Sequence, residues 1–156
     1  MKLAILQPNF FPLKSYYDLA RKVDKVIFLD DSLYNNKSWV NKALIKVKSK
    51  DYYFRIPIIR NESPTQIKDI RIKGNKWRRD FLKMINLGYQ HFPNFSSVFP
   101  VIKEIVDLPT DRAAHISAYS IFKICSLFGA ETQFAFSSID HGNIRASMEN
   151  KILDIC

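Results

Sequence analysis

A chain of 156 residues is long enough for one domain with a hydrophobic core. Apolar residues make up 47% and aromatic residues 13%, which excludes a disordered chain. The 24 Lys and Arg residues against 15 Asp and Glu residues give a formal net charge of +9. This surplus favours an anionic partner, such as nucleic acid, a phosphorylated metabolite, a nucleotide sugar or an anionic membrane face. Because the lysines are scattered along the chain, an ordinary Lys-rich surface is an equal alternative.

Cysteine usage and the hydrophobic pattern indicate the compartment. The two cysteines, Cys125 and Cys156, form neither a disulfide framework nor a metal cluster, which fits a reducing compartment. The apolar start before Gln7 is too short for the core of a signal peptide, and no apolar run approaches the length of a membrane span. We therefore expect a cytoplasmic protein without integral membrane association.

The first elements predict a strand–helix–strand unit. Residues 2–6 and 25–29 are short apolar runs typical of buried strands. Between them, apolar residues recur at helical spacing over 13–23, and Pro12 occupies the position at which a helix best tolerates proline. Such a unit normally makes a parallel pair of strands with a right-handed crossover.

The middle of the chain predicts further strands. Residues 39–47 and 52–59 are strand-like, and the polar residues between them indicate the turn of a hairpin. Pro57 ends the second of these strands or places it on an edge. A short third strand is suggested by Ile67, Ile70 and Ile72.

Helices dominate the second half. Gly88 is a natural stop for the first of them, and Pro100 interrupts the second and is a candidate for its start. Thr110 is a candidate cap for the longest helix, and Ser147 for the last. The expected elements are helices at 76–87, 95–106, 111–128 and 148–156, and a strand at 132–136.

Together these elements predict an α/β fold. We expect a Rossmann-like three-layer domain with a mostly parallel sheet, the N-terminal strand–helix–strand unit and a helical C-terminal half. No repeat, low-complexity stretch or linker divides the chain, so residues 1–156 are predicted to form a single domain. The last helix reaches Cys156 without a stop signal. We therefore expect that the natural domain continues past this residue or that the gene product is truncated.

Polar residues follow the first strand in the stretch QPNFFP, residues 7–12. In an open parallel sheet, ligands bind beyond the carboxyl ends of the strands. Gln7 and Asn9 could orient a ligand there through their amide groups, and the next helix start could receive a phosphate or carboxylate. The alternative is an ordinary polar turn stiffened by two prolines.

A carboxylate pair, Asp30 and Asp31, follows the second strand. Carboxylates at this position can bind a divalent cation, hold a ribose hydroxyl or act as a base. In a strand conformation the two would point to opposite faces, so we expect one of them in any one site. The alternative is a solvated turn, where Asp is common. The pair and the QPNFFP stretch are predicted to share one edge of the sheet.

Other motifs are less specific. A basic cluster surrounds Trp77 and could bind phosphates, although a solvated amphipathic helix gives the same pattern. His91, His115 and His141 show no order typical of a catalytic triad, and His115 is assigned a structural role. The positions of the four glycines exclude a GxGxxG loop and a P-loop, and no zinc spacing occurs. The basic cluster consists of Arg71, Lys73, Lys76, Arg78, Arg79 and Lys83.

The chain resembles the WbqC-like family over nearly its whole length. The matching stretches are ILQPNFFPLKSYYDL, DKVIFLDD, the WVNK element at 39–42, FRIPI and KWRRDFLKMINLGYQHFP. Two departures stand out. Many relatives carry Gly before the helix tyrosine, where this chain has Ser15, and relatives continue beyond a segment like NKILDIC into a Gly-rich strand–loop region.

The resemblance implies a pathway, because the family is linked to gene clusters for O-antigen and other surface polysaccharides. It implies a transferase or ligase that acts on an amino sugar or nucleotide-linked sugar by acyl or aminoacyl transfer. Asp30 and Asp31 are the catalytic candidates, as base or as ligand of Mg²⁺, and Mg²⁺ or a nucleotide is the candidate cofactor. The alternative is a non-catalytic module that binds an anionic ligand, with nucleic acid less favoured. The substrate-binding candidates are Gln7, Asn9, Tyr16, Asn41, Lys42 and Trp77.

Overall fold

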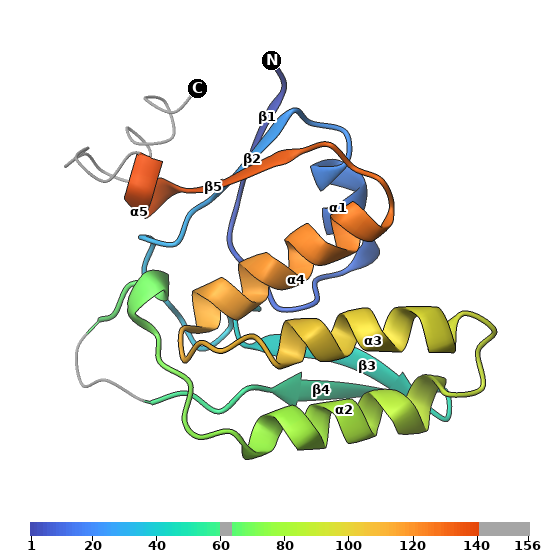
Figure 1. The fold of residues 1–156 in the computed structure, drawn as a ribbon. Coiled ribbons are helices and arrows are strands. Elements are labelled where there is room, and N and C mark those ends of the chain that lie inside the picture. Colours follow the sequence, from blue (N-terminus) through green and yellow to red (C-terminus); the bar gives the residue numbers. More distant parts are fainter. Residues whose placement is uncertain (60–63, 141–156) are drawn as a thin grey trace.

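The computed structural model describes residues 1–59 and 64–140. Figure 1 shows an upper part built around one sheet and a lower part built around a hairpin and two helices, with α4 between them. The helix expected at 148–156 and His141 lie outside the described residues.

The upper sheet has three parallel strands in the order β1-β2-β5. They are β1 (Leu3–Leu6), β2 (Lys25–Phe28) and β5 (Gln133–Phe136). Leu6 is in register with Phe28, and Phe28 with Phe136, so all three strands end at one level. The predicted parallel strand–helix–strand unit is thereby confirmed, and so is the strand near 132–136. The residues that follow the three strands emerge along one edge.

Two helices, α1 (Lys14–Ala20) and α4 (Ala113–Leu127), cover the same face of this sheet. Ala4, Val26 and Phe28 point to this face and share one buried cluster with Ala20 and Ile121. The chain crosses the sheet in one direction, from β1 to β2 to β5, and connections of one hand then put their helices on one face. The α/β class is confirmed, but the described residues give two layers here, and the third layer of the expected Rossmann-like domain is not among them.

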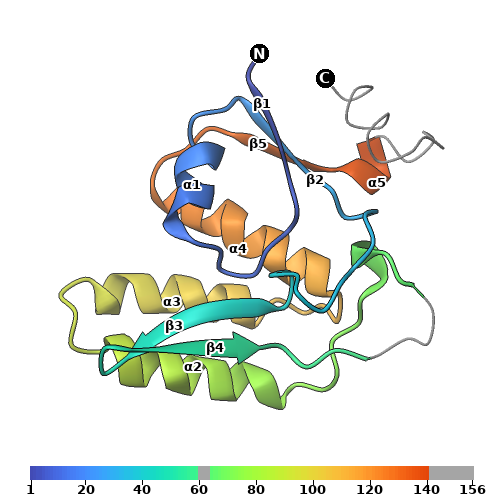
Figure 2. The same ribbon diagram turned by 180° about the vertical axis from the view of Figure 1, so that it is seen from behind.

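The lower part begins with the expected hairpin, formed by β3 (Lys42–Val47) and β4 (Lys50–Arg55). Its two-residue turn holds Lys48 at φ 49° and Ser49 at φ 64°, which is the left-handed geometry of a type I′ turn. Helices α2 (Lys76–Tyr89) and α3 (Phe95–Val106) pack on one side of the hairpin, as the two opposite views in Figures 1 and 2 show.

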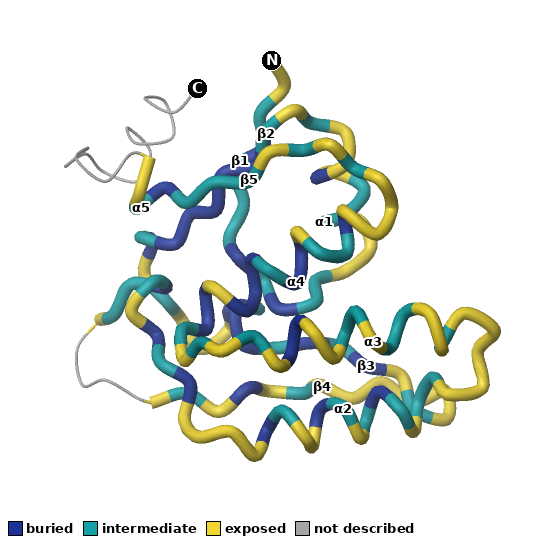
Figure 3. Tube along the Cα trace, in the orientation of Figure 1, coloured by how far each residue is buried: buried dark blue, intermediate teal, exposed yellow. Residues whose placement is uncertain are grey.

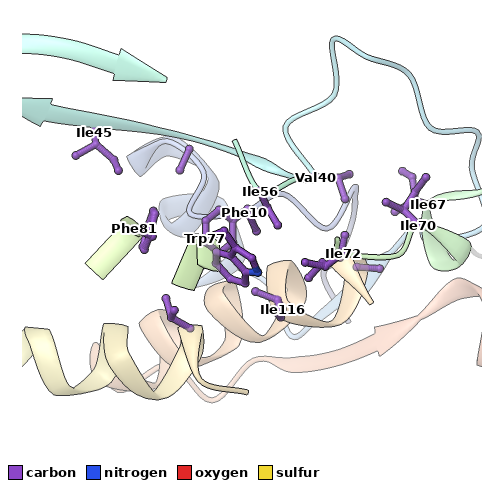
Figure 4. Packing of buried hydrophobic residues seen from close by; sticks show 14 of the residues in the cluster. Phe10, Val40, Ile45, Ile56, Ile67, Ile70, Ile72, Trp77, Phe81 and Ile116 are labelled. Carbon is purple, nitrogen blue, oxygen red and sulfur yellow. The ribbon is translucent and has the colours of Figure 1, made fainter. Parts of the chain in front are cut away.

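The core of the lower part is rich in aromatic rings. Phe10 is fully buried and lies against Trp77 and Phe81, with ring centroids 6.0 and 5.1 Å away (Figure 4). Helix α4 joins this core to the upper one, since Ile116 belongs to the lower cluster and Ile121 to the upper one. Figure 3 shows the same division of burial, with β2 largely buried and β4 largely exposed.

The predicted third strand is wrong. Ile67 starts a short 3₁₀ helix, η1 (Ile67–Asp69), and only isolated bridges follow, from Ile72 to Ile58 and from Arg71 to Arg112. The three-residue step from Ile67 to Ile70 suits a 3₁₀ turn, which puts both side chains on one side. Both are buried in the lower core.

Two helix boundaries also differ from the predictions, whereas α3 (Phe95–Val106) confirms the helix expected at 95–106. Gly88 lies inside α2, where a β-carbon would come within 2.5 Å of the Lys46 carbonyl oxygen. It is therefore a packing glycine and does not end the helix. Helix α3 starts at Phe95 and contains Pro100. Helix α4 starts at Ala113, and the Thr110 hydroxyl accepts a hydrogen bond from the Arg112 N–H just before it, at 3.1 Å.

Candidate functional site

Several segments meet at the carboxyl edge of the sheet. In Figure 1 the ends of β2 and β5, the short helix α5 (Ser137–Asp140), η1 and the start of α4 all lie on the left side. The Lys68 N–H donates to the Asp30 carbonyl at 2.6 Å, and the Arg112 guanidinium donates to the Lys68 carbonyl at 2.8 Å. We call this region the sheet-edge site, defined by Asp30, Asp31, His115, Ser137 and Ser138.

Asp30 anchors this site. Its side chain is buried and accepts hydrogen bonds from the Ser138 hydroxyl at 2.6 Å and the Ser138 N–H at 3.0 Å, and the Ser137 hydroxyl oxygen lies 3.2 Å away. These bonds satisfy both carboxylate oxygens, as a buried charge requires. Asp30 therefore fixes the start of α5 against the end of β2.

Asp31 is half-buried and lies closer to the Ser137 hydroxyl, at 2.6 Å. A hydroxyl has one proton to donate, so the shorter distance gives that proton to Asp31. Strand β2 ends at Phe28, and the two aspartates follow it in a tight turn that begins with a hydrogen bond from the Asp30 N–H to the Phe28 carbonyl, 2.9 Å long. The strand-based expectation of opposite orientations is wrong, because both carboxylates reach Ser137.

His115, which the sequence assigned a structural role, lies in the first turn of α4 beside this edge. Its ring centroid is 5.7 Å from that of Phe136, the last residue of β5. Desolvation by neighbouring atoms lowers the pKa of the imidazole, and Arg112 and Arg71 lower it further, whereas Asp30 opposes them. The imidazole is therefore uncharged at neutral pH and can accept a proton.

The QPNFFP loop is held firmly in place beyond β1. The Tyr16 hydroxyl donates to the Gln7 carbonyl, and burial raises the pKa of this tyrosine well above its usual range. The Phe10 N–H donates to the Trp39 carbonyl at 2.9 Å, and the Phe11 N–H to the buried Ser120 hydroxyl at 3.2 Å. The loop is thus fixed at three points, and Tyr16 acts by positioning its backbone.

Asn9 carries an unsatisfied acceptor in this loop. Its Oδ1 atom is buried and has no hydrogen-bond partner among the described residues. A buried acceptor without a donor costs free energy, and a ligand N–H or O–H group would remove that cost. Helix α1, which follows the loop, has only seven residues, so its start contributes little to anion binding.

Asn41 and Lys42 lie in the lower part. The Asn41 side chain is buried, donates to the Ile56 carbonyl at 2.9 Å and accepts from the Tyr34 hydroxyl at 3.1 Å, so it is engaged in structure. The Lys42 ammonium lies 4.4 Å from the centre of the Trp39 ring, a cation–π contact on the hairpin surface.

Trp77 and two members of the basic cluster, Arg71 and Arg78, are also engaged in structural contacts. Trp77 is 3% exposed and belongs to the lower core. Arg78 donates to the Val106 and Thr110 carbonyls and so closes the end of α3. Arg71 pairs with Asp111 at 2.6 Å. The structure therefore does not bring Trp77, Asn41 or Lys42 to the sheet edge.

The described residues hold no group of three or more His, Cys, Asp or Glu side chains suited to a metal ion. Both Asp30 oxygens already accept hydrogen bonds from Ser138, so this carboxylate does not fit a Mg²⁺ ion. Within residues 1–59 and 64–140, none of the helices has the length and apolar character needed to span a bilayer.

A model described as the WbqC-like protein family matches residues 7–156. The chain belongs to the WbqC-like family. The curated proteins include a relative from Mycobacterium tuberculosis (strain ATCC 25618 / H37Rv), named uncharacterized protein Rv1507c, which is 25% identical over 138 residues. The match covers 87% of this WbqC-like chain and 60% of that relative, so the chain spans about 60% of the relative's length. No solved structure matches the chain.

The WbqC-like match begins at Gln7, the first residue of the QPNFFP loop, and also includes the segments after β2 and β5. The sequence motifs pointed to the first two of these segments. Ser137 and Ser138 had no motif to mark them, and His115 is far from Asp30 in the chain. Their place at the WbqC-like sheet edge follows from the parallel pairing of β5 with β2.

Proposed function

We propose that this chain is part of an enzyme of surface-polysaccharide (O-antigen) biosynthesis that transfers an acyl or aminoacyl group to an amino sugar or nucleotide-linked sugar in the cytoplasm. Membership of the WbqC-like family supports the pathway. One observation carries the choice of site: Asp31 and the Ser137 hydroxyl lie 2.6 Å apart beyond the ends of β2 and β5, and the His115 ring lies against Phe136, the last residue of β5. This is where an open parallel sheet normally binds its ligands.

The proposed transfer needs a base. The amine nitrogen of the sugar attacks the carbonyl carbon of an activated acyl or aminoacyl donor, and a C–N bond forms. The bond from that carbon to the leaving group breaks, and the leaving group takes the electron pair. The proton lost by the nitrogen goes to His115, whose lowered pKa keeps it free to accept. Asp31, held by Ser137, would orient the amine, and Asp30 would hold the site together.

The charges near His115 suit an anionic substrate. Arg112 and Arg71 both lower its pKa, against Asp30 and Asp111, so their guanidinium groups lie within electrostatic reach of this edge. Guanidinium groups bind phosphate oxygens well, so these two side chains are candidates to hold the diphosphate of a nucleotide sugar. On the β1 side, Gln7 and Asn9 would contact the sugar, with Asn9 Oδ1 accepting from a hydroxyl or amide group.

A binding panel with matched variants tests the proposal. Nucleotide-linked amino sugars, free amino sugars and nucleotides would be titrated against the protein by calorimetry. We expect Asp31→Asn to weaken binding of the preferred ligand by about tenfold, since a hydrogen bond to a charged group is worth about 1.5 kcal/mol or more. Asp51→Asn is the control, because this carboxylate is exposed on the hairpin. Unchanged binding and pathway output in both Asp30→Asn and Asp31→Asn would show that the site is wrong.

A non-catalytic module for an anionic ligand is the second candidate. It is favoured by the complete engagement of Asp30 in hydrogen bonds, which leaves this carboxylate a structural role. Binding without turnover of any donor–acceptor pair would distinguish it from an enzyme. If the anionic ligand were nucleic acid, the binding affinity would fall steeply with salt concentration. It would also fall in Arg79→Gln, which removes the charge of an exposed side chain.

A further inference from the structure

An apolar cavity of about 400 Å³, open to solvent, lies where the lower part meets helices α1 and α4. It is lined by helices α2 and α3, strand β3, the end of the QPNFFP loop, Tyr17 of α1 and Ile124 of α4. Its floor consists of buried residues, among them Ala43, Ile45 and Phe81, whereas Phe92 at its mouth is 62% exposed. The cavity therefore runs from solvent down to the lower core.

The cavity is elongated along the two helices. Phe81, Ile85 and Tyr89 line it at four-residue steps on α2, a span of roughly 12 Å at 1.5 Å per residue. Val98 and Ile102 line the opposite wall from α3. The cavity is therefore a channel between two rows of apolar side chains, a shape that suits an extended chain.

The lining selects an uncharged, apolar occupant. None of the described residues that line the cavity carries a charge at neutral pH, and most are aliphatic or aromatic. The Tyr89 hydroxyl already accepts a hydrogen bond from the Lys46 N–H at 3.0 Å, and Asn94 lies exposed near the mouth. Few polar groups remain to bind a sugar or a nucleotide inside.

The size also argues against a simple packing defect. Interior side chains normally pack closely, whereas here a row of apolar side chains lines a cavity that is open to solvent. Ligand pockets commonly measure about 300–1,000 Å³ and have mainly hydrophobic and aromatic walls. We propose that the cavity binds a linear aliphatic chain, of the acyl or isoprenoid kind.

The QPNFFP loop connects the two regions. Phe11 and Pro12 line the cavity, while Gln7 and Asn9 of the same loop follow β1 toward the sheet edge. Chain binding at this cavity does not depend on the proposed reaction. If both proposals hold, the QPNFFP loop would contact the aliphatic chain through Phe11 and Pro12 and the sugar through Gln7 and Asn9.

The experiment is a calorimetric titration with saturated fatty acids of increasing length, and with farnesol as the isoprenoid arm. We expect affinity to rise by about fourfold per methylene group until the cavity is filled, and then to level off. The arm that binds more tightly identifies the source of the chain. Failure of every aliphatic probe to bind the wild-type protein would overturn the proposal.

Two substitutions on α3 provide a matched pair. Val98→Trp fills the cavity and should weaken chain binding at least tenfold, whereas Val101→Trp, on the same helix but outside the lining, should bind as the wild type does. Equal affinities in the two variants would also overturn the proposal. If Val98→Trp does not fold, Ile102→Phe narrows the same wall. Asp31→Asn should bind chains normally, so failure of one proposal is distinguishable from failure of the other.

Discussion

Ser138 donates its hydroxyl proton to Asp30 Oδ2 over 2.6 Å, although 108 positions separate the two residues in the chain. Its N–H donates to the other carboxylate oxygen at 3.0 Å. This pair joins the end of β2 to the start of α5 and so closes the edge at which the candidate site lies.

Replacing Asp30 by Asn should destabilise the fold. Hydrogen bonds to a charged group are worth about 1.5–3 kcal/mol, and Asn offers one acceptor oxygen in place of two. We expect the free energy of unfolding, measured by urea denaturation, to fall by about 2–3 kcal/mol. The control Asp51→Asn removes an exposed carboxylate and should stay within about 0.5 kcal/mol of the wild type. If Asp30→Asn were as stable as Asp51→Asn, Asp30 would not anchor the start of α5.

His115 should make stability depend on pH. Its pKa is lowered in the folded protein by desolvation and then by Arg112 and Arg71, so the unfolded chain binds the proton more tightly. The stabilising contribution of the neutral imidazole is therefore complete above the unfolded pKa of about 6.5, and it is lost as pH falls from there to the folded value.

Urea denaturation between pH 5 and pH 8 measures this effect. In His115→Gln, the free energy of unfolding should fall less steeply as pH is lowered, because no proton then binds at this position. His91→Gln, which removes a histidine from the exposed end of the lower part, is the matched substitution against which the His115→Gln profile is compared. A His115→Gln profile parallel to that of the wild type would count against the lowered pKa.

Local periodicity was enough to predict most individual elements. The apolar runs that became β1, β2 and β5 and the helical spacing in α1, α2 and α4 are properties of neighbouring residues. The arrangement of the helices on the sheet could not be predicted from neighbouring residues. Whether α4 covers the same face as α1 depends on β5 lying on the far side of β2 from β1, and nothing near Gln133 encodes that order.

The candidate site shows the same limit. Asp30, Asp31 and the QPNFFP loop follow strands directly, so their common edge was predictable once the strands were recognised. The hydrogen bonds of Asp30 with Ser138 and its electrostatic effect on His115 are tertiary, and no motif marks either partner. The core position of Trp77 was hidden because an amphipathic helix gives one pattern whether its aromatic face meets a core or a ligand.

Substitutions in the turn between β3 and β4 should stabilise the protein. Lys48 and Ser49 both have positive φ angles, which L-residues other than Asn and Asp adopt at a cost of about 1–2 kcal/mol each. The pair Asn-Gly is preferred in this turn. Gly also loses more conformational entropy on folding than other residues, which reduces the stabilisation. We expect Lys48→Asn with Ser49→Gly to raise the free energy of unfolding by about 1 kcal/mol.

Ser49→Ala is the control for the turn. Alanine keeps a β-carbon at the same positive φ, so it relieves no strain and should give no gain in urea denaturation. If the double variant were no more stable than Ser49→Ala, the left-handed turn would not be a source of strain.

Gly88→Ala should destabilise the protein, even though alanine favours a helix over glycine by about 1 kcal/mol. The added β-carbon would lie 2.5 Å from the backbone oxygen of Lys46 and 3.4 Å from a methyl carbon of Val47. Backbone cannot move aside as a flexible side chain can, so α2 would have to shift away from β3, at a typical cost of about 1–3 kcal/mol. Asn86→Ala, two residues earlier on α2, adds no β-carbon at this contact and should be neutral or slightly stabilising. Thermal and urea unfolding of both variants measure the difference, and a Gly88→Ala protein as stable as Asn86→Ala would contradict the close approach of α2 to β3.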